Sequence, residues 1–556
     1  MKRLWKWLRN IFIILILLIL GLLTYAYFRI QIDEPILEDR SAFNLERHAT
    51  DDSAWTCQGD WLREDASGLY EMHISGSPLE LGVKHGLLAK ELIAYQEDAF
   101  VAEIKNKIPS DFYLGFLKYF IGWFNRDMTD YVPRENQLEI YGVSQYTDEQ
   151  YDFIAPKYQR ILNYHGAHDI GHALQNMNLV ACTAFGVWDS MSADGQLMIG
   201  RNFDFYVGDQ FAEKKIVAFV EPNKGYRFMF ITWGGLTGVV SGMNDAGLSI
   251  TLNSAKSDIP TAAYTPVSIV ARQILQHCST IDEAFAKAKT FKTFVSESFY
   301  IGSAKDRKAA IIEKSPDTLA LYTTSKNHLS LTNHFQSEVF KNDLLNIENI
   351  AESASMYRLQ RVEELLAYQD SFGVADFARL LRDQKGLHNA DIGFCNEKAI
   401  NQLIAHHSII FKPESQQVWV STHPFQLGEY ICYDLNKVWS GQADYKTNLH
   451  IDSLKIDADP FLFTKAFEET QMYRKGAKAI QKASSNGEEI EPYFIEKFLQ
   501  SNPKFFHVYK VVGDYYASKG MKEKAISTYE KAFLCEFPRI IDKTDIEESI
   551  AKLKEK

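Results

Sequence analysis

One cysteine gives the first indication of chemistry. Cys182 stands in "NLVACTAFGVWDS", between apolar residues and a threonine, just before a pattern typical of a strand and a turn. Free cysteine is among the most buried residue types, so a structural thiol is the simplest interpretation. The alternative is a nucleophile, since a thiolate can form a covalent acyl intermediate. The choice depends on which other groups the fold brings to this thiol.

Polar residues that could serve the thiol follow in two later segments. "LMIGRNFDF" contains Arg201, Asn202 and Asp204 in or beside a strand, and "LSLTNHF" presents Asn333 at a strand end. Successive strand residues face opposite sides, so Asn202 and Asp204 share one face and Arg201 lies on the other. A twist or bulge is therefore needed to bring Arg201 and Asp204 into one pocket. Alone, each also has an ordinary role as an ion pair, a turn residue or a cap.

A group of histidines offers a metal-binding alternative. "YHGAHDIGH" contains His165, His168 and His172, and on a helix the last two share a face. Asp169 stands where the HExxH zinc proteases have glutamate, but it is one methylene shorter, and no third ligand stands out downstream. We expect no metal, and keep a zinc protease as a minor alternative that chelators would inactivate. The sequence also has no P-loop, no G-x-S-x-G elbow and no G-x-G-x-x-G after a strand, so we expect no cofactor.

The elements that must position these residues alternate between helical and strand patterns. "LYEMHISGSPLELGVKHGLLAKELIAY" predicts a strand, a turn and a long helix, and helical pattern continues to about 175. Its aromatic piece, "DFYLGFLKYFIGWFNRDM", is interpreted as core, or else as the lining of a groove for an apolar ligand. A period of two over 182–255 predicts an antiparallel sheet. Helices over 265–290 and 350–368 alternate with further strands that end near 437, which predicts a layered α+β domain.

The N-terminal sequence is typical of a membrane anchor. "MKRLWKWLRN" carries four cations and precedes "IFIILILLILGLLTYAYF", an uncharged run long enough to span a bilayer. The cations should stay cytoplasmic, which places the chain after Arg29 on the periplasmic or extracellular side. The alternative is a cleaved signal peptide and a secreted protein. Ala26 lies between two tyrosines without an A-x-A pattern, which favours an uncleaved anchor over 1–29, followed by a polar linker over 30–68.

Length and composition limit the classes of protein. A chain of 556 residues predicts two or three domains. Its hydrophobic share of 46% and charged share of 24% are typical of a folded protein. The net charge of −12 argues against a nucleic-acid partner, because phosphate binding needs a basic surface. Six scattered cysteines without a CxxC indicate neither a zinc site nor a dense disulfide framework, and leave one or two long-range disulfides open.

The C-terminal region, 438–556, has a different pattern. In "VYKVVGDYYASKGMKEKAISTYEKAFLCEFP" seven residues have the spacing of a tetratricopeptide repeat (TPR): Tyr509, Gly513, Tyr516, Gly520, Ala525, Tyr529 and Ala532. We expect a small helical region packed on itself or on the main domain. Its role is structural, or else it docks a partner protein.

Taken together, the segments resemble one known family. "CTAFGVWDSMSADGQLMIGRNFDF" resembles the start of the catalytic chain in N-terminal-nucleophile (Ntn) hydrolases of linear amides. These are the acyl-CoA:6-aminopenicillanate acyltransferases, acid ceramidase, N-acylethanolamine acid amidase and the choloylglycine hydrolases. The shared features are Cys-Thr, a short strand, a turn and then G-R-N-x-D. The likeness extends through "GMNDAGLSITLN", "LTNHF", "SMYRLQR" and "SIIFKPESQQVWVSTHP", and covers 69–437.

The resemblance implies a fold and a way of maturing. The fold would be an αββα four-layer sandwich of antiparallel sheets, here with a transmembrane helix in front and a TPR-like helical region behind. Such enzymes are precursors whose thiol attacks the preceding peptide bond, here Ala181–Cys182. The freed α-amine, with an ordinary pKa near 8, then serves as the base for its own thiol.

The resemblance also assigns roles to residues. Asp204 would orient the new amine, and Arg201 would favour the thiolate, since a nearby cation lowers the pKa of a thiol. Asn333 would donate to the oxyanion, a contact whose loss typically costs about 10²–10³ in rate. Asn253 would share that role or contact the substrate. An arginine on the late helix supports the site, here Arg358.

Two points in this assignment stay open. Arg361 competes with Arg358 for the role of the supporting arginine. Ala181 stands where many relatives have glycine, and the spacing from Cys182 to G-R-N is a few residues longer than in the ceramidase-like members. Self-cleavage that is slower than in relatives, or absent, therefore stays an open alternative.

The function expected from all this is hydrolysis of a linear, non-peptide amide through an acyl-thioester on Cys182. The acyl group is expected to be apolar, because a membrane tether and the aromatic piece over 112–124 suit lipid-like amides. One alternative is an acyltransferase that uses an amine acceptor. The other is a catalytically silent, membrane-tethered scaffold or binding protein. The expected partners are a small-molecule amide, the membrane through the N-terminal helix, and a protein on the TPR-like tail.

Overall fold

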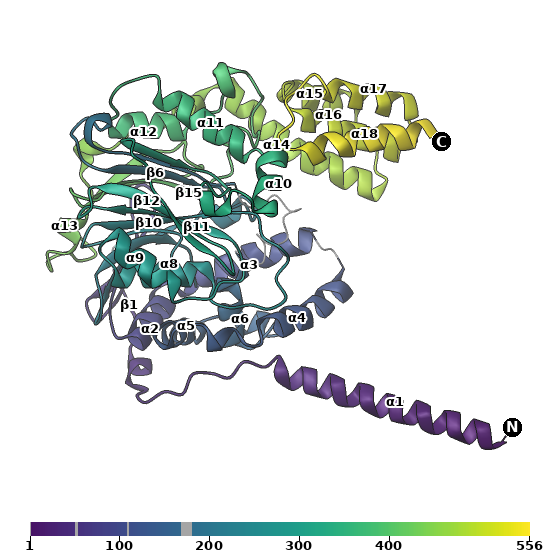
Figure 1. Cartoon of the computed structure of the whole chain (residues 1–556), viewed down its shortest axis with the longest axis horizontal. Coiled ribbons are helices and arrows are strands. Elements are labelled where there is room, and N and C mark those ends of the chain that lie inside the picture. The colour runs from purple at the N-terminus through teal and green to yellow at the C-terminus, as the bar shows by residue number, and fades with distance from the viewer. Residues whose placement is uncertain (1, 51–53, 108–109, 168, 170–180, 556) are drawn as a thin grey trace.

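The chain forms a mixed α/β body of two stacked sheets with helices on both outer faces (Figure 1). The computed structural model describes residues 2–50, 54–107, 110–167, 169 and 181–555. In this part of the chain the larger sheet has eleven strands and the smaller has six.

The larger sheet runs in the order β1-β2-β3-β4-β7-β8-β9-β10-β11-β12-β13. Its strands are β1 (His48–Ala49), β2 (Trp55–Cys57), β3 (Asp60–Glu64), β4 (Tyr70–Gly76), β7 (Ile216–Pro222), β8 (Phe228–Thr232), β9 (Ser241–Asn244), β10 (Leu248–Ser254), β11 (Glu297–Ser303), β12 (Lys308–Lys314) and β13 (Leu319–Tyr322). It is antiparallel except where β4 pairs with β7 in parallel, which differs from the predicted wholly antiparallel sheet. A parallel pair needs a long crossover connection, and the helices between these two strands provide it.

The smaller sheet contains β5, the strand that directly follows the candidate nucleophile Cys182. Its order is β14-β5-β6-β15-β16-β17, and all of its pairs are antiparallel. The strands are β14 (His328–Leu331), β5 (Thr183–Val187), β6 (Met198–Phe203), β15 (His407–Lys412), β16 (Gln417–Ser421) and β17 (Tyr430–Asp434).

Three hydrophobic cores define the layers. One core lies between the sheets and includes Ile199, Phe219 and Ile409. A second lies between the larger sheet and the helices α2 (Pro78–Leu88), α3 (Lys90–Lys107), α5 (Arg134–Ser144), α6 (Lys157–His165), α8 (Val267–His277) and α9 (Ile281–Lys289). A third lies between the smaller sheet and the helices α11 (Ser355–Leu366) and α12 (Val374–Leu381), with α10 (Leu344–Glu352) preceding α11. This helix–sheet–sheet–helix order agrees with the predicted αββα sandwich.

Small residues allow α2 and α5 to touch along their backbones. A Cβ on Gly82 would lie 2.0 Å from the carbonyl oxygen of Glu139, and one on Gly142 would lie 2.7 Å from the backbone nitrogen of Val83. Any larger residue would therefore push the helices apart. At its start, α2 is closed by a capping box between Ser77 and Glu80, which satisfies backbone N–H groups that the first turn leaves free.

The segment expected as a linker, 30–68, is only partly a spacer. From His48 onward it forms β1, β2 and β3, which extend the larger sheet. Cys57, Trp61 and Leu62 are buried there. The acidic composition of the segment concealed these apolar side chains, whose burial drives the pairing.

The N-terminal helix α1 (Lys2–Arg29) projects away from the body (Figure 1). Its most apolar window of 18 residues has a mean hydropathy of 2.7 and is not buried inside the structure. By length and composition this helix could cross a membrane, and a signal sequence would pass the same test.

The aromatic stretch interpreted as core is buried only in part. It forms α4 (Asp111–Asn125), which exposes Tyr113, Phe116, Tyr119, Phe120 and Trp123, whereas Phe124 and Met128 belong to the core. Aromatic content alone does not distinguish the side of a helix that faces a core from the side that faces outward.

The C-terminal region becomes helical at Lys465. Residues 438–464 instead wrap the smaller sheet, with bridges from Tyr433 to His450 and from Tyr430 to Ile456. Five helices follow (Figure 1): α14 (Lys465–Asn486), α15 (Pro492–Ser501), α16 (Phe506–Ser518), α17 (Lys522–Ala532) and α18 (Ile540–Glu555). The α16–α17 hairpin lies where the TPR pattern was noted, and its assignment as a TPR stays a prediction.

Candidate active site

Cys182 lies directly before β5 and is fully buried. The pairing of β5 with β6 sets Ala184 opposite Arg201, so the neighbouring strand delivers the arginine to the thiol. Nη2 of Arg201 donates to Sγ of Cys182 at 3.4 Å. The two residues that the sequence motif linked are thus in contact.

The guanidinium of Arg201 is held on several sides. Nη1 donates to Oγ of Ser241 at 2.6 Å and to the carbonyl oxygen of Val240 at 3.2 Å, and Nη2 also donates to the carbonyl oxygen of Leu252. Its cationic carbon lies 4.2 Å from the centre of the Phe203 ring. Such a fixed, buried cation cannot turn away from the thiol, which makes it a permanent source of positive charge there.

Asp204 directly follows the last residue of β6, so its side chain is no longer bound by the alternation of strand residues between the two faces of the sheet. It is fully buried, and neither of its carboxylate oxygens has a hydrogen-bond partner among the described residues. Burial raises the pKa of Asp204 to about 7, although the charges of Arg358 and Arg201 oppose the shift. Asn202 points away, donating to the carbonyl oxygens of Leu381 and Ile400, and so holds the helical layer instead.

Arg358 joins three parts of the site. Its Nη1 donates to the carbonyl oxygen of Cys182 at 2.6 Å and to Oγ1 of Thr183 at 2.9 Å, and its Nη2 donates to Oδ1 of Asn333 at 2.7 Å. At the other end of the Asn333 amide, Nδ2 donates to the carbonyl oxygen of Ser254 at 3.0 Å and to its Oγ at 3.1 Å. Asn253, the preceding residue, donates to the carbonyl oxygen of Thr332 at 3.1 Å.

The directions in which Arg358 and Arg361 point decide which of the two arginines supports the site. Arg361 faces away from Cys182 and forms ion pairs with Asp383 at 2.8 Å and Glu364 at 3.0 Å. Arg358 is the arginine that contacts the site. A spacing of three residues on one helix could not separate them in the sequence.

The thiol is protonated near neutral pH in this uncut chain. Burial raises the pKa of Cys182 to about 11, and the positive charge of Arg201 reverses this only in part. The expectation that Arg201 favours the thiolate concerns the cut enzyme, and the direction of its effect is the same here, since its charge lowers the pKa of the thiol. In the uncut chain desolvation outweighs this effect, because Cys182 is fully buried.

Three further buried groups beside the site were not anticipated. Gln402 donates through Nε2 to the carbonyl oxygen of Ala181 at 3.3 Å. His407 contacts Oγ of Ser241 at 2.9 Å, the same hydroxyl that Arg201 contacts. Glu297 has no hydrogen-bond partner for either carboxylate oxygen among the described residues, and burial raises its pKa well above the usual range. No local motif marks them, since each reaches the site from a distant segment.

Among the residues that the structure describes, the histidine motif forms no metal site. His165 ends α6 and is buried, with its Nε2 3.0 Å from Oγ1 of Thr237. Asp169 accepts a hydrogen bond from the backbone nitrogen of Val267 at 2.9 Å. His168 and His172 lie outside the described residues. All six cysteines are free thiols, so neither of the disulfides left open is present.

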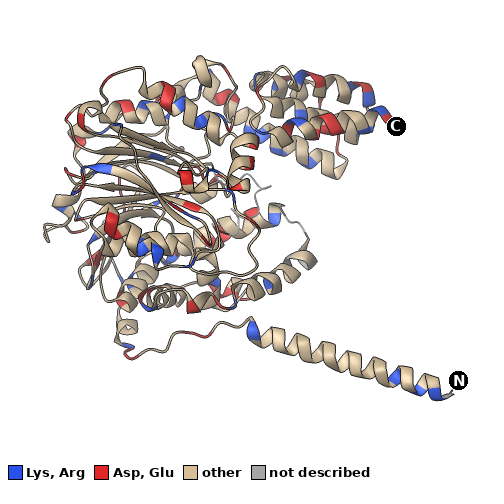
Figure 2. Cartoon of the chain, in the orientation of Figure 1, with Lys and Arg blue, Asp and Glu red and all other residues tan. Residues whose placement is uncertain are grey.

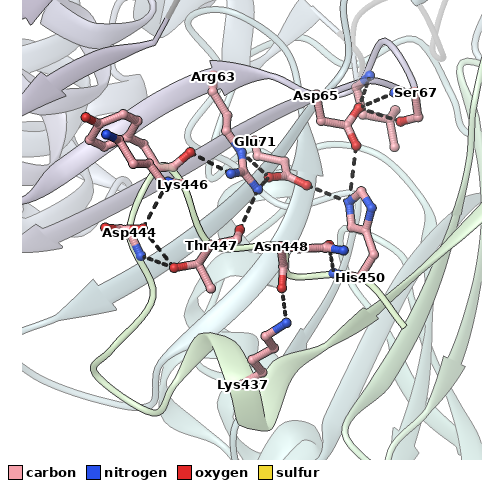
Figure 3. Close-up of polar contacts among 12 residues, drawn as sticks. Arg63, Asp65, Ser67, Glu71, Lys437, Asp444, Lys446, Thr447, Asn448 and His450 are labelled. Atoms are coloured by element: carbon pink, nitrogen blue, oxygen red, sulfur yellow. Dashed lines mark hydrogen bonds and ion pairs between the residues drawn. The ribbon is translucent and has the colours of Figure 1, made fainter. Parts of the chain in front are cut away.

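One other cluster could hold a metal by its residue types. The ligand atoms of Asp65, Glu71 and His450 lie within 4.8 Å of one another (Figure 3). Nε2 of His450 lies 2.8 Å from Oε1 of Glu71 and 3.2 Å from Oδ2 of Asp65. Arg63 already pairs with the other oxygen of Glu71 and donates to the carbonyl oxygen of Thr447 at 2.9 Å. We interpret the cluster as an ionic clamp between β3–β4 and the segment after β17.

This clamp predicts a pH-dependent stability. Burial lowers the pKa of His450, but its hydrogen bonds to Asp65 and Glu71 raise the pKa by a larger amount, so that the net value is about 9. Because the folded pKa lies above the ordinary value near 6.5, the stabilisation is complete below pH 6.5 and is lost as the pH rises through 9. We expect His450→Gln to cost at most about 3 kcal/mol at pH 6.5 and close to nothing at pH 10, measured as urea midpoints.

The exposed His48 provides the control for this prediction. His48→Gln should leave the midpoint unchanged at both pH values. An equal loss for His450→Gln at pH 6.5 and pH 10 would show that the clamp stabilises by packing and not by charge.

An apolar pocket adjoins the site. It encloses about 640 Å³ of empty space, part of it open to solvent, and its lining includes Phe100, Tyr164, Phe205, Trp233 and Val240. Phe205 follows Asp204, and the carbonyl oxygen of Val240 contacts Arg201. The lining is mostly apolar and includes a few polar residues such as Gln96 and His165, which is the usual form of a small-molecule site.

The family comparison agrees with this geometry. Residues 190–425 match the family model "acyl-coenzyme A:6-aminopenicillanic acid acyl-transferase". The match begins after Cys182 and includes Arg201, Asp204 and Arg358. The resemblance predicted from the sequence is confirmed for this segment.

Relatives of known sequence are distant. An uncharacterized protein of Archaeoglobus fulgidus is 25% identical over 432 residues, 69% of this chain and 70% of its own length. Protein dcd1B of Dictyostelium discoideum is 22% identical over 279 residues, 47% of this chain, and this chain spans only 53% of its length.

The similar solved structures are Ntn hydrolases. An N-acylethanolamine-hydrolyzing acid amidase ortholog of Caenorhabditis elegans has a TM-score of 0.31 and 18% identity, covering 42% of this chain and 93% of that one. A conjugated bile acid hydrolase of Clostridium perfringens has a TM-score of 0.33 and 13% identity, covering 48% and 97%. Penicillin V acylase of Agrobacterium tumefaciens has a TM-score of 0.31 and 14% identity, covering 46% and 87%.

Proposed function

We propose that this protein is a self-processing cysteine amidohydrolase that cleaves linear, non-peptide amides with an apolar acyl group. One observation carries the proposal: the thiol of Cys182 contacts the guanidinium of Arg201, while its own carbonyl oxygen is held by Arg358. Cys182 is thus anchored at both ends beside the unpartnered carboxylate of Asp204. The family match, named for an acyl transfer, supports the same class of chemistry.

Self-processing is the first step. The sulfur of Cys182 attacks the carbonyl carbon of Ala181, and the thiol proton passes to Asp204, whose pKa of about 7 suits a base near neutral pH. The C–N bond then breaks, the Cys182 nitrogen takes the proton and leaves as an amine, and Ala181 is held as a thioester. Water hydrolyses this thioester. The products are residues 1–181 and residues 182–556.

Amide cleavage repeats the chemistry on a substrate. The freed α-amine of Cys182 takes the thiol proton, and the sulfur attacks the amide carbonyl. Asn333, oriented by Arg358, donates Nδ2 to the resulting oxyanion, with Asn253 beside it. The substrate amine leaves with the proton, and water releases the acyl group from the thioester. An amine in place of water would make the enzyme an acyltransferase.

The pocket beside Arg201 supports the choice of substrate. Its aromatic lining would hold an acyl chain, while the reacting carbonyl would lie toward Cys182. Burial of each chain methylene contributes about 0.8 kcal/mol, so longer acyl chains should bind more tightly until the pocket is full. The apolar helix α1 supports a membrane-anchored location with the catalytic domain on the non-cytoplasmic side.

The direct test is N-terminal sequencing and intact mass of the purified protein, followed by trapping of the acyl-enzyme with N-acyl amides of increasing chain length. We expect a chain that begins at Cys182, and a mass increase of one acyl group on it. An uncut chain over pH 4–9 without acyl adducts would favour the silent scaffold.

Gln402 predicts a separable effect on processing. It donates to the carbonyl oxygen of Ala181, the oxygen that would become negative during self-cleavage. We expect Gln402→Ala to slow self-cleavage by about 10²-fold, in line with the loss of one oxyanion donor. The measurement is the time course of cut and uncut chains after synthesis.

A matched control is Gln426→Ala, which removes another buried glutamine whose Nε2 donates to the carbonyl oxygen of Leu381. It should cut at the wild-type rate. Equal slowing by both substitutions would place the effect in the stability of the domain.

A further inference from the structure

The helix α4 (Asp111–Asn125) exposes a continuous aromatic face. This face is defined by five side chains, each at least 41% exposed: Tyr113, Phe116, Tyr119, Phe120 and Trp123. Their spacing of three and four residues sets them on one side of the helix. Soluble proteins rarely expose contiguous apolar patches of this kind unless something covers them.

The contacts of α4 indicate what covers it. The chain that leaves α1 is fastened to the C-terminal end of α4: Nη2 of Arg29 lies 2.7 Å from Oδ1 of Asp127. A Cβ on Gly122 would lie 3.1 Å from the side chain of Ile30, so the two segments pack closely. Gln159 donates to the carbonyl oxygen of Ile30 at 2.7 Å and fixes it from α6. If α1 crosses a bilayer, its end emerges at the membrane surface, and these contacts hold α4 there.

The charges of this region fit a lipid interface. Figure 2 shows α1, whose middle carries no charged residue, on the same side of the body as α4. Along α4 only Asp111 and Lys118 are charged. Tryptophan and tyrosine prefer the headgroup level of a bilayer, and here the guanidinium of Arg126 stacks on Trp123 at 4.5 Å. With so few charges, the attraction would be apolar and would not need anionic lipids.

We propose that the aromatic face of α4 lies in the interfacial layer of a phospholipid bilayer, as a second membrane contact beside α1. The chain then touches the membrane at two places, α1 and α4. Two contacts fix the orientation of the body on the membrane, whereas α1 alone would let the body rotate about the axis of that helix. The helix α3, which contributes Ile93 and Phe100 to the apolar pocket, precedes α4 in the chain. The membrane contact stands on the structure of α1 and α4 and does not depend on the proposed chemistry.

The test uses the full chain in phosphatidylcholine nanodiscs that contain a small fraction of a photoactivatable phosphatidylcholine with its diazirine high on the acyl chain. After illumination and digestion, lipid adducts are mapped by mass spectrometry. We expect adducts on α1 and on the peptide covering 111–125. The double variant Phe116→Ser/Phe120→Ser should lose at least five-fold of the adducts on that peptide and keep those on α1.

A matched control is Phe463→Ser/Leu534→Ser, which removes two exposed apolar side chains of the C-terminal region, 82% and 86% exposed. Their peptides should carry no adducts in the wild type. Adducts confined to α1 would overturn the proposal. Crosslinks between the α4 peptides of two chains, formed by a bifunctional diazirine reagent in a parallel sample with two copies per disc, would overturn it as well, because a second copy would then cover the face.

Discussion

Replacing Cys182 by alanine is expected to leave the chain uncut and to lower amide hydrolysis by about 10⁴-fold or more. The thiol is the only sulfur that Arg201 contacts among the described residues, and the bond to be cut precedes the same residue. Both activities should therefore disappear together. The measurement combines N-terminal sequencing with the hydrolysis rate of an N-acyl amide.

Cys432→Ala is the matched control for this result. Cys432 is also a buried free thiol of the smaller sheet, on β17, but it lies outside the site. It should cut and hydrolyse as the wild type does. Persistent cleavage at Ala181–Cys182 in the Cys182→Ala chain would mean that another group, or another protein, performs the cut.

The second large effect is expected from two arginines on one helix. Arg358→Met should lower kcat by about 10³-fold, because Asn333 loses the contact that orients its amide and the carbonyl of Cys182 loses its anchor. Arg361→Met should keep kcat in the folded protein and instead lower its stability by about 3–5 kcal/mol, since it breaks a buried ion pair with Asp383.

Both variants need two readouts, kcat with KM and the urea midpoint. Arg358→Lys should recover part of kcat, because one of its N–H donors can still reach Asn333 or Cys182. An equal loss of kcat in the Arg358 and Arg361 variants would mean that both residues act only through the stability of the fold. This result would contradict the assignment of Arg358 to the site.

The tail contributes indirectly to the same region. Arg474 of α14 pairs with Asp209 and donates to the carbonyl oxygen of Leu403, the residue after Gln402. Asn502 exchanges hydrogen bonds with the backbone of Phe394. The helical tail thus fixes the loop that carries Gln402. Deletion of the tail would be expected to disturb self-processing before it disturbs the two sheets.

Local sequence was sufficient where the signal was local. The period of two over 182–255 anticipated the strands β5 to β10, but the single sheet predicted there was wrong, since β5 and β6 belong to the smaller sheet and β7 to β10 to the larger one. The family resemblance, through G-R-N-x-D, predicted Arg201 and Asp204 near Cys182, and the pairing of β5 with β6 brings Arg201 to the thiol. Local sequence did not predict α12 or the strands β1 to β3, because their short apolar stretches are hidden in polar composition. The role of each site residue is still a prediction.

What the sequence alone determined was the set of chemical groups: a thiol, two arginines, a carboxylate and two amides, in an order that matches one family. What only the tertiary structure decided was their relation in space. It separated Arg358 from Arg361 and turned Asn202 away. It also added Gln402 and exposed α4. The physical reason is that contacts between distant segments, and the loss of water around them, depend on how whole layers pack, and no residue carries that information in its own neighbourhood.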